Sequence, residues 1–175
     1  VRIQVVEDKP RYARAELVEV IKPAPHRITP RCAHFGICGG CHYQHLSYPD
    51  QLAAKEAVFE DQLQRIGKIA DPPLEKIIPS PQPWNYRNQI QFQISPEGRL
   101  GFRQQHSHQL VDIQECHLPE PLLNMIWPVV EAEHIPGLDR VILRSGEGEQ
   151  DALLILESKD PHPLSFELDL PLSAV

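Results

Sequence analysis

The sequence lacks any hydrophobic run close to the roughly 20 residues that a membrane-spanning helix needs. Hydrophobic residues nevertheless make up 41% of its 175 positions, which is enough for a real core. A chain of this length suits one ordinary domain or two small ones. We therefore expect a soluble protein with no membrane partner.

Cysteine is scarce, and its spacing is the most informative feature of the chain. Three of the four cysteines, Cys32, Cys38 and Cys41, fall within ten residues, and Cys116 lies far downstream, in the pattern C-x5-C-x2-C-x74-C. The pair Gly39-Gly40 allows the backbone to fold tightly between two of the thiols. Three clustered thiolates and a remote fourth predict a four-ligand metal or cluster site.

Several chemistries fit four cysteines, and spacing alone leaves them open. No signal peptide precedes the cysteines, which favours the cytoplasm, where disulfides are rare. Structural zinc usually takes two short ligand pairs, although a histidine could complete a Cys3His set; the nearby candidates are His34, His42 and His45. Histidines in a polar loop are otherwise ordinarily solvated. Ferredoxins of the plant type also use three clustered cysteines and one distant one, which favours iron and sulfur.

Charge is unevenly distributed along the chain. The net charge is -7, yet Lys plus Arg balance Asp plus Glu over residues 1–127, and the acidic excess belongs to residues 128–175. Within residues 9–31 the cations outnumber the acids: Lys9, Arg11, Arg14, Lys22, Arg27 and Arg31. Such a stretch either follows a phosphate backbone or forms a solvated strand face.

The first 68 residues predict a hairpin, a linker and a helix. Alternating apolar residues on either side of a turn at residues 7–10 are typical of a β-hairpin. Prolines at 23, 25 and 30 indicate a stiff linker. Ser47, with Asp50 three residues on, is a plausible helix N-cap, and Gly67 suits a left-handed stop. An apolar stripe at helical spacing is expected to cover the cysteine loop; it comprises Leu52, Phe59, Leu63 and Ile66.

The remaining residues predict an antiparallel sheet with a short helix. Proline-rich residues 71–83 form a connector, followed by a hairpin with its turn at residues 95–98 and a strand at 110–113. Residues 120–133 indicate a short helix interrupted near Pro128, and strands at 140–145 and 151–158 flank a Gly-x-Gly segment. That segment lacks a third glycine and is acidic, so we interpret it as a hairpin turn, not a nucleotide loop. The fold class is α+β, with a mostly antiparallel sheet.

Several motifs follow one another in a specific order over about residues 1–160. They are Cys32-x5-Cys38-Gly39-Gly40-Cys41; Gln44, Leu46, Tyr48, Gln51, Leu52, Lys55 and Gly67; Trp84-Asn85-Tyr86-Arg87-Asn88; Leu100-Gly101-Phe102; and Val111-Asp112-Ile113 leading to Cys116. This order resembles that of the RNA (uracil-5-)-methyltransferases that carry an iron-sulfur cluster, of the 23S ribosomal RNA type. The resemblance implies a [4Fe-4S] cluster held by the four cysteines.

The resemblance also implies a domain organisation. Residues 1–22 would be the last strands of an OB-like, RNA-binding TRAM barrel, residues 23–68 the cluster-binding loop and helix, and residues 69–175 the central antiparallel α+β domain. The family's C-terminal domain binds S-adenosylmethionine and supplies a nucleophilic cysteine and a carboxylate. This sequence has no fifth cysteine and no glycine-rich cofactor loop, so no catalytic residue is predicted here. We expect the chain alone to be inactive and S-adenosylmethionine to bind only to a full-length parent.

The implied partner is a single-stranded, uridine-containing loop of ribosomal RNA, bound by a monomer. We predict that cations and rings on two segments bind it: Lys9, Arg11, Arg14, Arg27 and Arg31 before the cluster, and Tyr86, Arg87, Arg99, Phe102 and Arg103 around the first sheet hairpin. Gln89 stands where these enzymes often carry a basic residue. The alternatives are a ferredoxin-like electron carrier and a zinc-dependent nucleic-acid-binding module.

Overall fold

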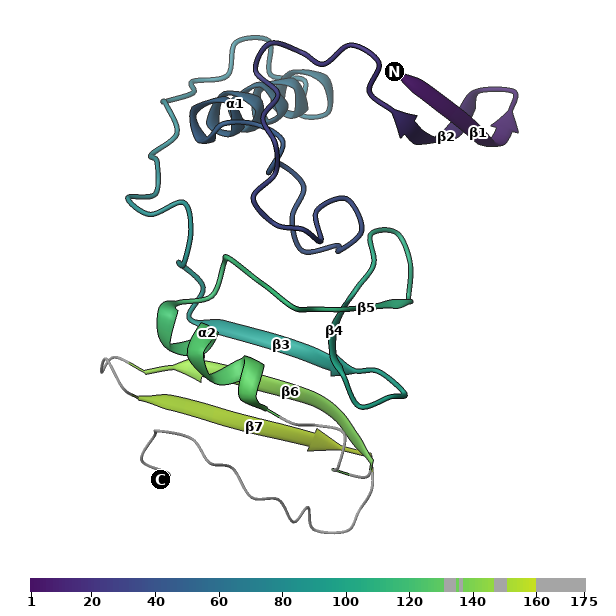
Figure 1. Ribbon diagram of the computed structural model, residues 1–175. Helices are drawn as coiled ribbons and strands as arrows, with labels where there is room; N and C mark the ends of the chain where they lie inside the picture. Colours follow the sequence, from purple (N-terminus) through teal and green to yellow (C-terminus); the bar gives the residue numbers. More distant parts are fainter. Residues whose placement is uncertain (131–134, 136, 147–150, 160–175) are drawn as a thin grey trace.

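The computed structural model describes residues 1–130, 135, 137–146 and 151–159. Figure 1 shows their elements stacked in tiers, with a hairpin and the long helix α1 above, an irregular loop in the middle, and a sheet with a short helix below. No helix in this described part is long and apolar enough to cross a bilayer.

The N-terminal hairpin is confirmed, with its turn later than predicted. Strands β1 (Arg2–Lys9) and β2 (Tyr12–Glu19) pair antiparallel. The predicted turn at residues 7–10 is wrong, because β1 continues to Lys9, which pairs directly with Tyr12. The apolar side chains of the hairpin stay more than half exposed at Ile3, Val5 and Leu17. The described residues form only this two-stranded sheet here, so the TRAM barrel stays a prediction.

Helix α1 (Tyr48–Arg65) begins as predicted and ends differently. The Ser47 hydroxyl accepts the Asp50 amide at the N-cap. The left-handed residue after the helix is Lys68, with φ 57°, and not Gly67. Gly67 is needed for another reason, since a Cβ there would lie 2.6 Å from the carbonyl oxygen of Leu63.

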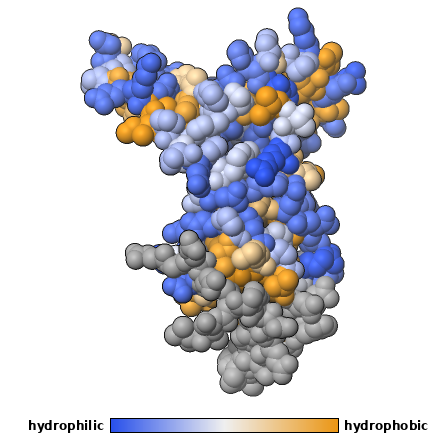
Figure 2. Space-filling model, turned by 60° about the vertical axis from the view of Figure 1, so that its left-hand side comes forward, coloured by the Kyte–Doolittle hydropathy of each residue, from blue (hydrophilic) through white to orange (hydrophobic). Residues whose placement is uncertain are grey.

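The expectation that the apolar stripe of α1 covers the cysteine loop is wrong. None of the residues of α1 is buried, and Phe59 is 54% exposed. The connector, predicted at residues 71–83, extends in the structure over residues 69–88, between α1 and β3. It contacts the helix instead: the Ile77 amide donates to Glu56 and the Ser80 amide to the Tyr48 hydroxyl. Figure 2 shows hydrophobic side chains exposed on both upper lobes, above a mostly hydrophilic waist.

The lower tier is a five-stranded sheet in which every pairing is antiparallel. Its order is β5-β4-β3-β6-β7, with β3 (Gln89–Ile94), β4 (Leu100–Arg103), β5 (Leu110–Asp112), β6 (Leu138–Ser145) and β7 (Ala152–Ser158). Gly98 in the β3–β4 turn has φ 79°, a conformation that glycine adopts at no steric cost. These strands and the α+β class are confirmed.

The core lies between this sheet and the short helix α2 (Pro121–Ile126), which continues as a 3-10 turn over Trp127–Val129. Phe92 is fully buried, and its ring contacts Trp127 at 5.3 Å and Phe102 at 4.9 Å between centroids. The interruption near Pro128 is confirmed, whereas residues 131–133 of the predicted helix lie outside the described residues. So do residues 147–150 of the Gly-x-Gly turn, although Gly146 donates to Asp151 across the ends of β6 and β7.

Candidate cysteine site

The cysteine loop folds as a series of tight turns docked on the end of β4. The amide of Cys38 donates to the His34 carbonyl at 2.9 Å, and the amide of Phe35 donates to the Cys32 carbonyl at 3.2 Å. The Gly39 amide donates to the Arg103 carbonyl at 2.9 Å, and a Cβ on Gly39 would lie 3.1 Å from that oxygen. The first glycine of the predicted pair is therefore needed for close approach of the loop to the sheet.

Two hydrogen bonds at the residues just before Cys116 join the segment after β5 to this loop. The Gln114 amide donates to Nε2 of His34 at 3.1 Å, and the Ala33 amide donates to the carboxylate of Glu115. The Ala33 amide also holds the pKa of the Glu115 carboxyl below its ordinary value. The remote cysteine is thus held beside the clustered ones by contacts of the two residues that precede it.

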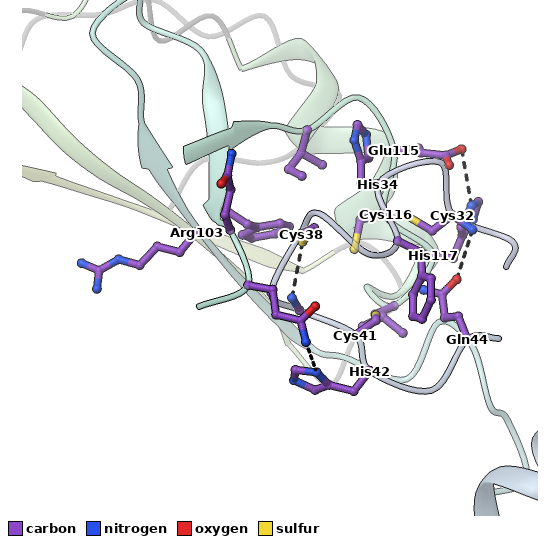
Figure 3. Close-up of a pocket in the computed structure, with 18 of the residues that line it drawn as sticks. Cys32, His34, Cys38, Cys41, His42, Gln44, Arg103, Glu115, Cys116 and His117 are labelled. Atoms are coloured by element: carbon purple, nitrogen blue, oxygen red, sulfur yellow. Dashed lines mark hydrogen bonds and ion pairs between the residues drawn. The ribbon is translucent and has the colours of Figure 1, made fainter. Parts of the chain in front are cut away.

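All four thiols line one cavity of about 570 Å³. Figure 3 shows the cysteines around one space, three from the loop and Cys116 from the opposite segment. Each is half-buried, and none forms a disulfide.

Burial makes these thiols hard to ionise together. It raises the pKa of Cys116 to about 11 and also raises the pKa of Cys32 and Cys38, and the neighbouring Cys41 adds to each shift. A thiolate is the form that binds metal. The positive charge of a bound metal group would stabilise these thiols in their ionised, thiolate form.

Residues that the sequence did not single out as site residues support the ligand segments. Gln44 is buried, and its Oε1 accepts the amide hydrogen of Cys32 at 3.1 Å, drawn as a dashed line in Figure 3. Glu115 holds the loop to the Cys116 segment through Ala33, and His34, considered above only as a zinc ligand, does so through Gln114. The sequence signal of Glu115 is its position before Cys116, and that of Gln44 is its place in the order of motifs.

The histidines considered as zinc ligands make other contacts. His34 accepts the Gln114 amide, Nδ1 of His42 lies 3.4 Å from Nε2 of Gln105, and the His45 ring packs on Phe35. Among the described residues, no group of three or more His, Cys, Asp or Glu side chains is placed so that it could hold a single metal ion. The donor set is four soft sulfurs around a cavity far larger than one water molecule needs.

The residues predicted to bind RNA divide between the cavity and other surfaces. Arg87, Phe102 and Arg103 line the cavity. Burial raises the pKa of Cys38 and Cys116, and the charge of Arg87 opposes that rise. Phe102 also stacks on the core ring of Phe92.

The other predicted cations lie elsewhere, and several are engaged by acids. Arg99 contacts Asp112 and Glu97, and Lys9 and Arg14 both contact Glu7. These three, with Arg11 at the hairpin turn, are not brought to the cavity. The guanidinium of Arg31 lies 5.3 Å from the Trp84 ring centroid. Arg27 is exposed, as is Tyr86.

No protein-family model matches the chain, but individual proteins do. An uncharacterized RNA methyltransferase of Thermosynechococcus vestitus is 33% identical over 96% of this chain and 41% of its own length. A 23S rRNA (uracil(1939)-C(5))-methyltransferase of Aeromonas hydrophila is 40% identical over 75% of this chain and 31% of its own length. The chain thus spans less than half the length of the curated relatives it matches.

A solved structure has a similar fold. It is the tRNA (uracil-54, C5)-methyltransferase of Pyrococcus abyssi in complex with S-adenosyl-L-homocysteine. The TM-score is 0.55 and the identity 24%, over 92% of this chain and 38% of that one. At this identity the likeness concerns the fold.

Proposed function

This chain belongs to the RNA (uracil-5-)-methyltransferase family, and we propose that it is the cluster-bearing, RNA-recognition portion of a 23S ribosomal RNA enzyme. Relatives named RNA methyltransferases match it over most of its length, and one of them is named for a 23S rRNA uracil. In this proposal the full-length parent transfers the methyl group, with S-adenosylmethionine as donor. The chain itself contributes recognition.

The convergence of Cys116 with Cys32, Cys38 and Cys41 on one cavity carries the proposal. We assign the four thiols to a [4Fe-4S] cluster. Sulfur ligands of a single tetrahedral zinc ion would lie about 3.8 Å apart, given a Zn–S bond of about 2.3 Å. The described residues offer no such single-ion arrangement, and a cluster of four irons holds its thiolates farther apart. The spacing of the cysteines and the family's order of motifs support the cluster over the zinc alternative.

When bound, the cluster supplies four iron–thiolate bonds that join the loop to the sheet domain, a contribution to folding like that of structural metal sites. The chain's own residues prepare this joint. Gln44 fixes the backbone at Cys32, and Glu115 fixes the segment that carries Cys116. Arg87, exposed beside the thiols, offers a positive charge to RNA phosphate at the same place. Cluster and RNA contact are thus assigned to adjoining surfaces.

The metal assignment is tested on protein purified without oxygen. We expect a brown sample that absorbs at about 400 nm through Fe–S charge transfer, with iron and sulfide in the protein. Replacing any one of Cys32, Cys38, Cys41 and Cys116 by Ser should lose the band, because each removes one of four ligands. Stoichiometric zinc without a visible band would contradict the assignment.

The RNA assignment is tested separately by titrating a uridine-containing RNA loop against the chain. Arg87→Ala should bind more weakly by about 1–3 kcal/mol and with a smaller salt slope. Equal affinity and equal salt dependence would remove Arg87 from the RNA surface. A control is Arg140→Ala, whose side chain pairs with Glu157 on the sheet.

A further inference from the structure

A second cavity, of about 400 Å³, adjoins the cysteine site. Its walls come from the end of the cysteine loop, the first turns of α1 and the end of the connector. Its volume is within the range of about 300–1,000 Å³ typical of small-molecule sites. The first cavity shares Cys41 and Gln44 with it.

Hydrogen bonds hold the three walls together. Nε2 of Gln51 on α1 donates to the Leu46 carbonyl at 3.0 Å, and the Ser80 amide of the connector donates to the Tyr48 hydroxyl at 2.7 Å. Asn85 has φ 54° and is fixed by bonds to the carbonyls of His117 and Pro119. Asn tolerates this left-handed conformation better than most residues. The bonds to Asn85 thereby set the positions of its two neighbours, Trp84 and Tyr86.

Rings and cations alternate around this cavity. Nζ of Lys55 lies 6.0 Å from the centroid of the Tyr43 ring, and the Arg31 guanidinium lies 5.3 Å from that of Trp84. Tyr86, which also lines the cavity, is 52% exposed. Aromatic rings and guanidinium planes are the surfaces on which unpaired bases stack.

The charge of this cavity is opposite to that of the chain as a whole. No Asp or Glu is among the described residues that line it, whereas Arg31, Lys55 and His42 are. Among the described residues, neither Arg31 nor Lys55 forms an ion pair with a carboxylate. Both cations are therefore available to an anion, unlike Lys9 and Arg14, which contact Glu7.

We propose that this cleft, lined by Arg31, Tyr43, Lys55, Trp84 and Tyr86, binds an unpaired nucleotide of single-stranded RNA. The base stacks on Tyr86 and on the Arg31–Trp84 pair, and Lys55 takes a flanking phosphate. The inference rests on the proposed RNA function. It joins Arg31 and Tyr86, two of the predicted RNA contacts, to three residues not predicted as contacts, Tyr43, Lys55 and Trp84, in one cleft. Because Cys41 belongs to both cavities, the cysteine site forms part of the wall that the nucleotide meets.

The test is RNA binding by the anaerobically purified chain, with a fluorescently labelled, uridine-containing single-stranded RNA as the probe. Tyr86→Leu should weaken binding about tenfold through lost stacking. Lys55→Gln should weaken it and lower the slope of log Kd against log salt by about 0.7, the change expected for one phosphate contact to a single strand.

Matched controls are available on the same helix as Lys55. Arg65→Gln removes a cation that pairs with Asp61 near the far end of α1, and Phe59→Leu removes an exposed ring outside the cleft. Both variants should bind RNA as the parent does. They also report any general effect of altering the surface of α1.

Tryptophan fluorescence gives a second readout. Trp84 lines the cleft, and the other tryptophan, Trp127, is 5% exposed in the core. RNA should quench the emission of the parent, and Trp84→Phe should abolish the quenching while a ring remains to stack on. Quenching that persists in Trp84→Phe would place the base elsewhere.

The outcomes separate this inference from the function on which it rests. If the parent binds RNA and the cleft variants behave like Arg65→Gln and Phe59→Leu, the proposal that the cleft binds a nucleotide is contradicted, and the proposed RNA function stands. If the parent fails to bind RNA even at low salt, the RNA function falls, and the cleft falls with it. Selective loss in Tyr86→Leu and Lys55→Gln supports the proposal.

Discussion

Two side chains that are not cysteines, one neutral and one acidic, position the cysteine segments through hydrogen bonds to the backbone. The amide oxygen of buried Gln44 accepts a hydrogen bond from the Cys32 amide. The carboxylate of Glu115, the residue before Cys116, accepts one from the Ala33 amide. Hydrogen bonds of this kind orient ligand segments before a metal is bound and tune the site afterwards.

Gln44→Ala should lower the free energy of unfolding by about 1–3 kcal/mol, because it leaves the Cys32 amide without its partner and opens a buried space. Urea unfolding of the parent and variant measures the difference. Gln64→Ala is the matched control, since Gln64 bonds to Glu60 on an exposed face of α1. An equal effect of the two substitutions would contradict the role given to Gln44.

The stability of the metal-free chain should fall at alkaline pH. Burial raises the pKa of Cys116 from its ordinary value of 9.0 to about 11. Between pH 9 and 11 the unfolded chain releases a proton that the folded chain keeps, so the stabilisation present below pH 9 is lost as pH rises through 11. Unfolding free energies measured across this window should decline less in Cys116→Ser, whose hydroxyl does not ionise there. Identical pH profiles would count against a buried thiol at this position.

At the scale of elements, α1 links the cysteine loop to the connector. Its cap residue Ser47 ends the loop, and its first turns hold Leu46 and Ser80 through Gln51 and Tyr48. The helix is therefore stabilised by its ends and by backbone contacts with its neighbours, because none of its side chains is buried. A marginal helix of this kind depends strongly on its cap.

Ser47→Ala should destabilise the folded chain by about 1 kcal/mol, because the Asp50 amide loses its acceptor. Ser47→Thr retains a hydroxyl and should cost less. Helical circular dichroism during urea unfolding gives the measurement. A loss as large for Thr as for Ala would mean that packing around Ser47, and not the cap bond, determines the effect.

At the scale of the whole molecule, the upper tier and the sheet are joined by the cysteine site and by the connector. The core of the lower tier contains the largest fully buried side chains, such as Phe92, Leu123 and Val141. The upper tier contains an exposed hairpin and a helix without buried residues. Its attachment to the sheet therefore depends on the loop that docks at Gly39 and on the thiols around the cavity.

Limited trypsin digestion should reveal this dependence. In Cys116→Ser we expect faster cleavage at Lys76 in the exposed connector and at Arg65, with cleavage at Arg140 and Arg144 in β6 unchanged, because the sheet keeps its own core. Mass spectrometry of the fragments over time identifies each site. Uniformly faster cleavage at all four sites would indicate instead that the two tiers unfold as one unit.

The sequence by itself determined the local features of this protein. The period-two strands, the Ser47 cap, the turn around Gly98 and the break near Pro128 depend on neighbours within a few residues, and the structure has them all. The cysteine spacing and the order of motifs likewise indicated the family. Boundaries were less certain: the turn at residues 7–10 failed because the strand pairing, and not local propensity, extends β1 to Lys9.

The tertiary structure alone decided which distant groups meet. No local pattern shows that Glu115 and His34 join the Cys116 segment to the cysteine loop, or that Arg99 is paired with Asp112 and Arg31 lies over Trp84. An apolar stripe at helical spacing likewise shows which side chains share a face of the helix, but not what covers that face. The stripe that includes Phe59 is for this reason wrongly predicted to cover the cysteine loop. These properties depend on contacts between residues more than ten positions apart in the sequence, which only the folded chain brings together.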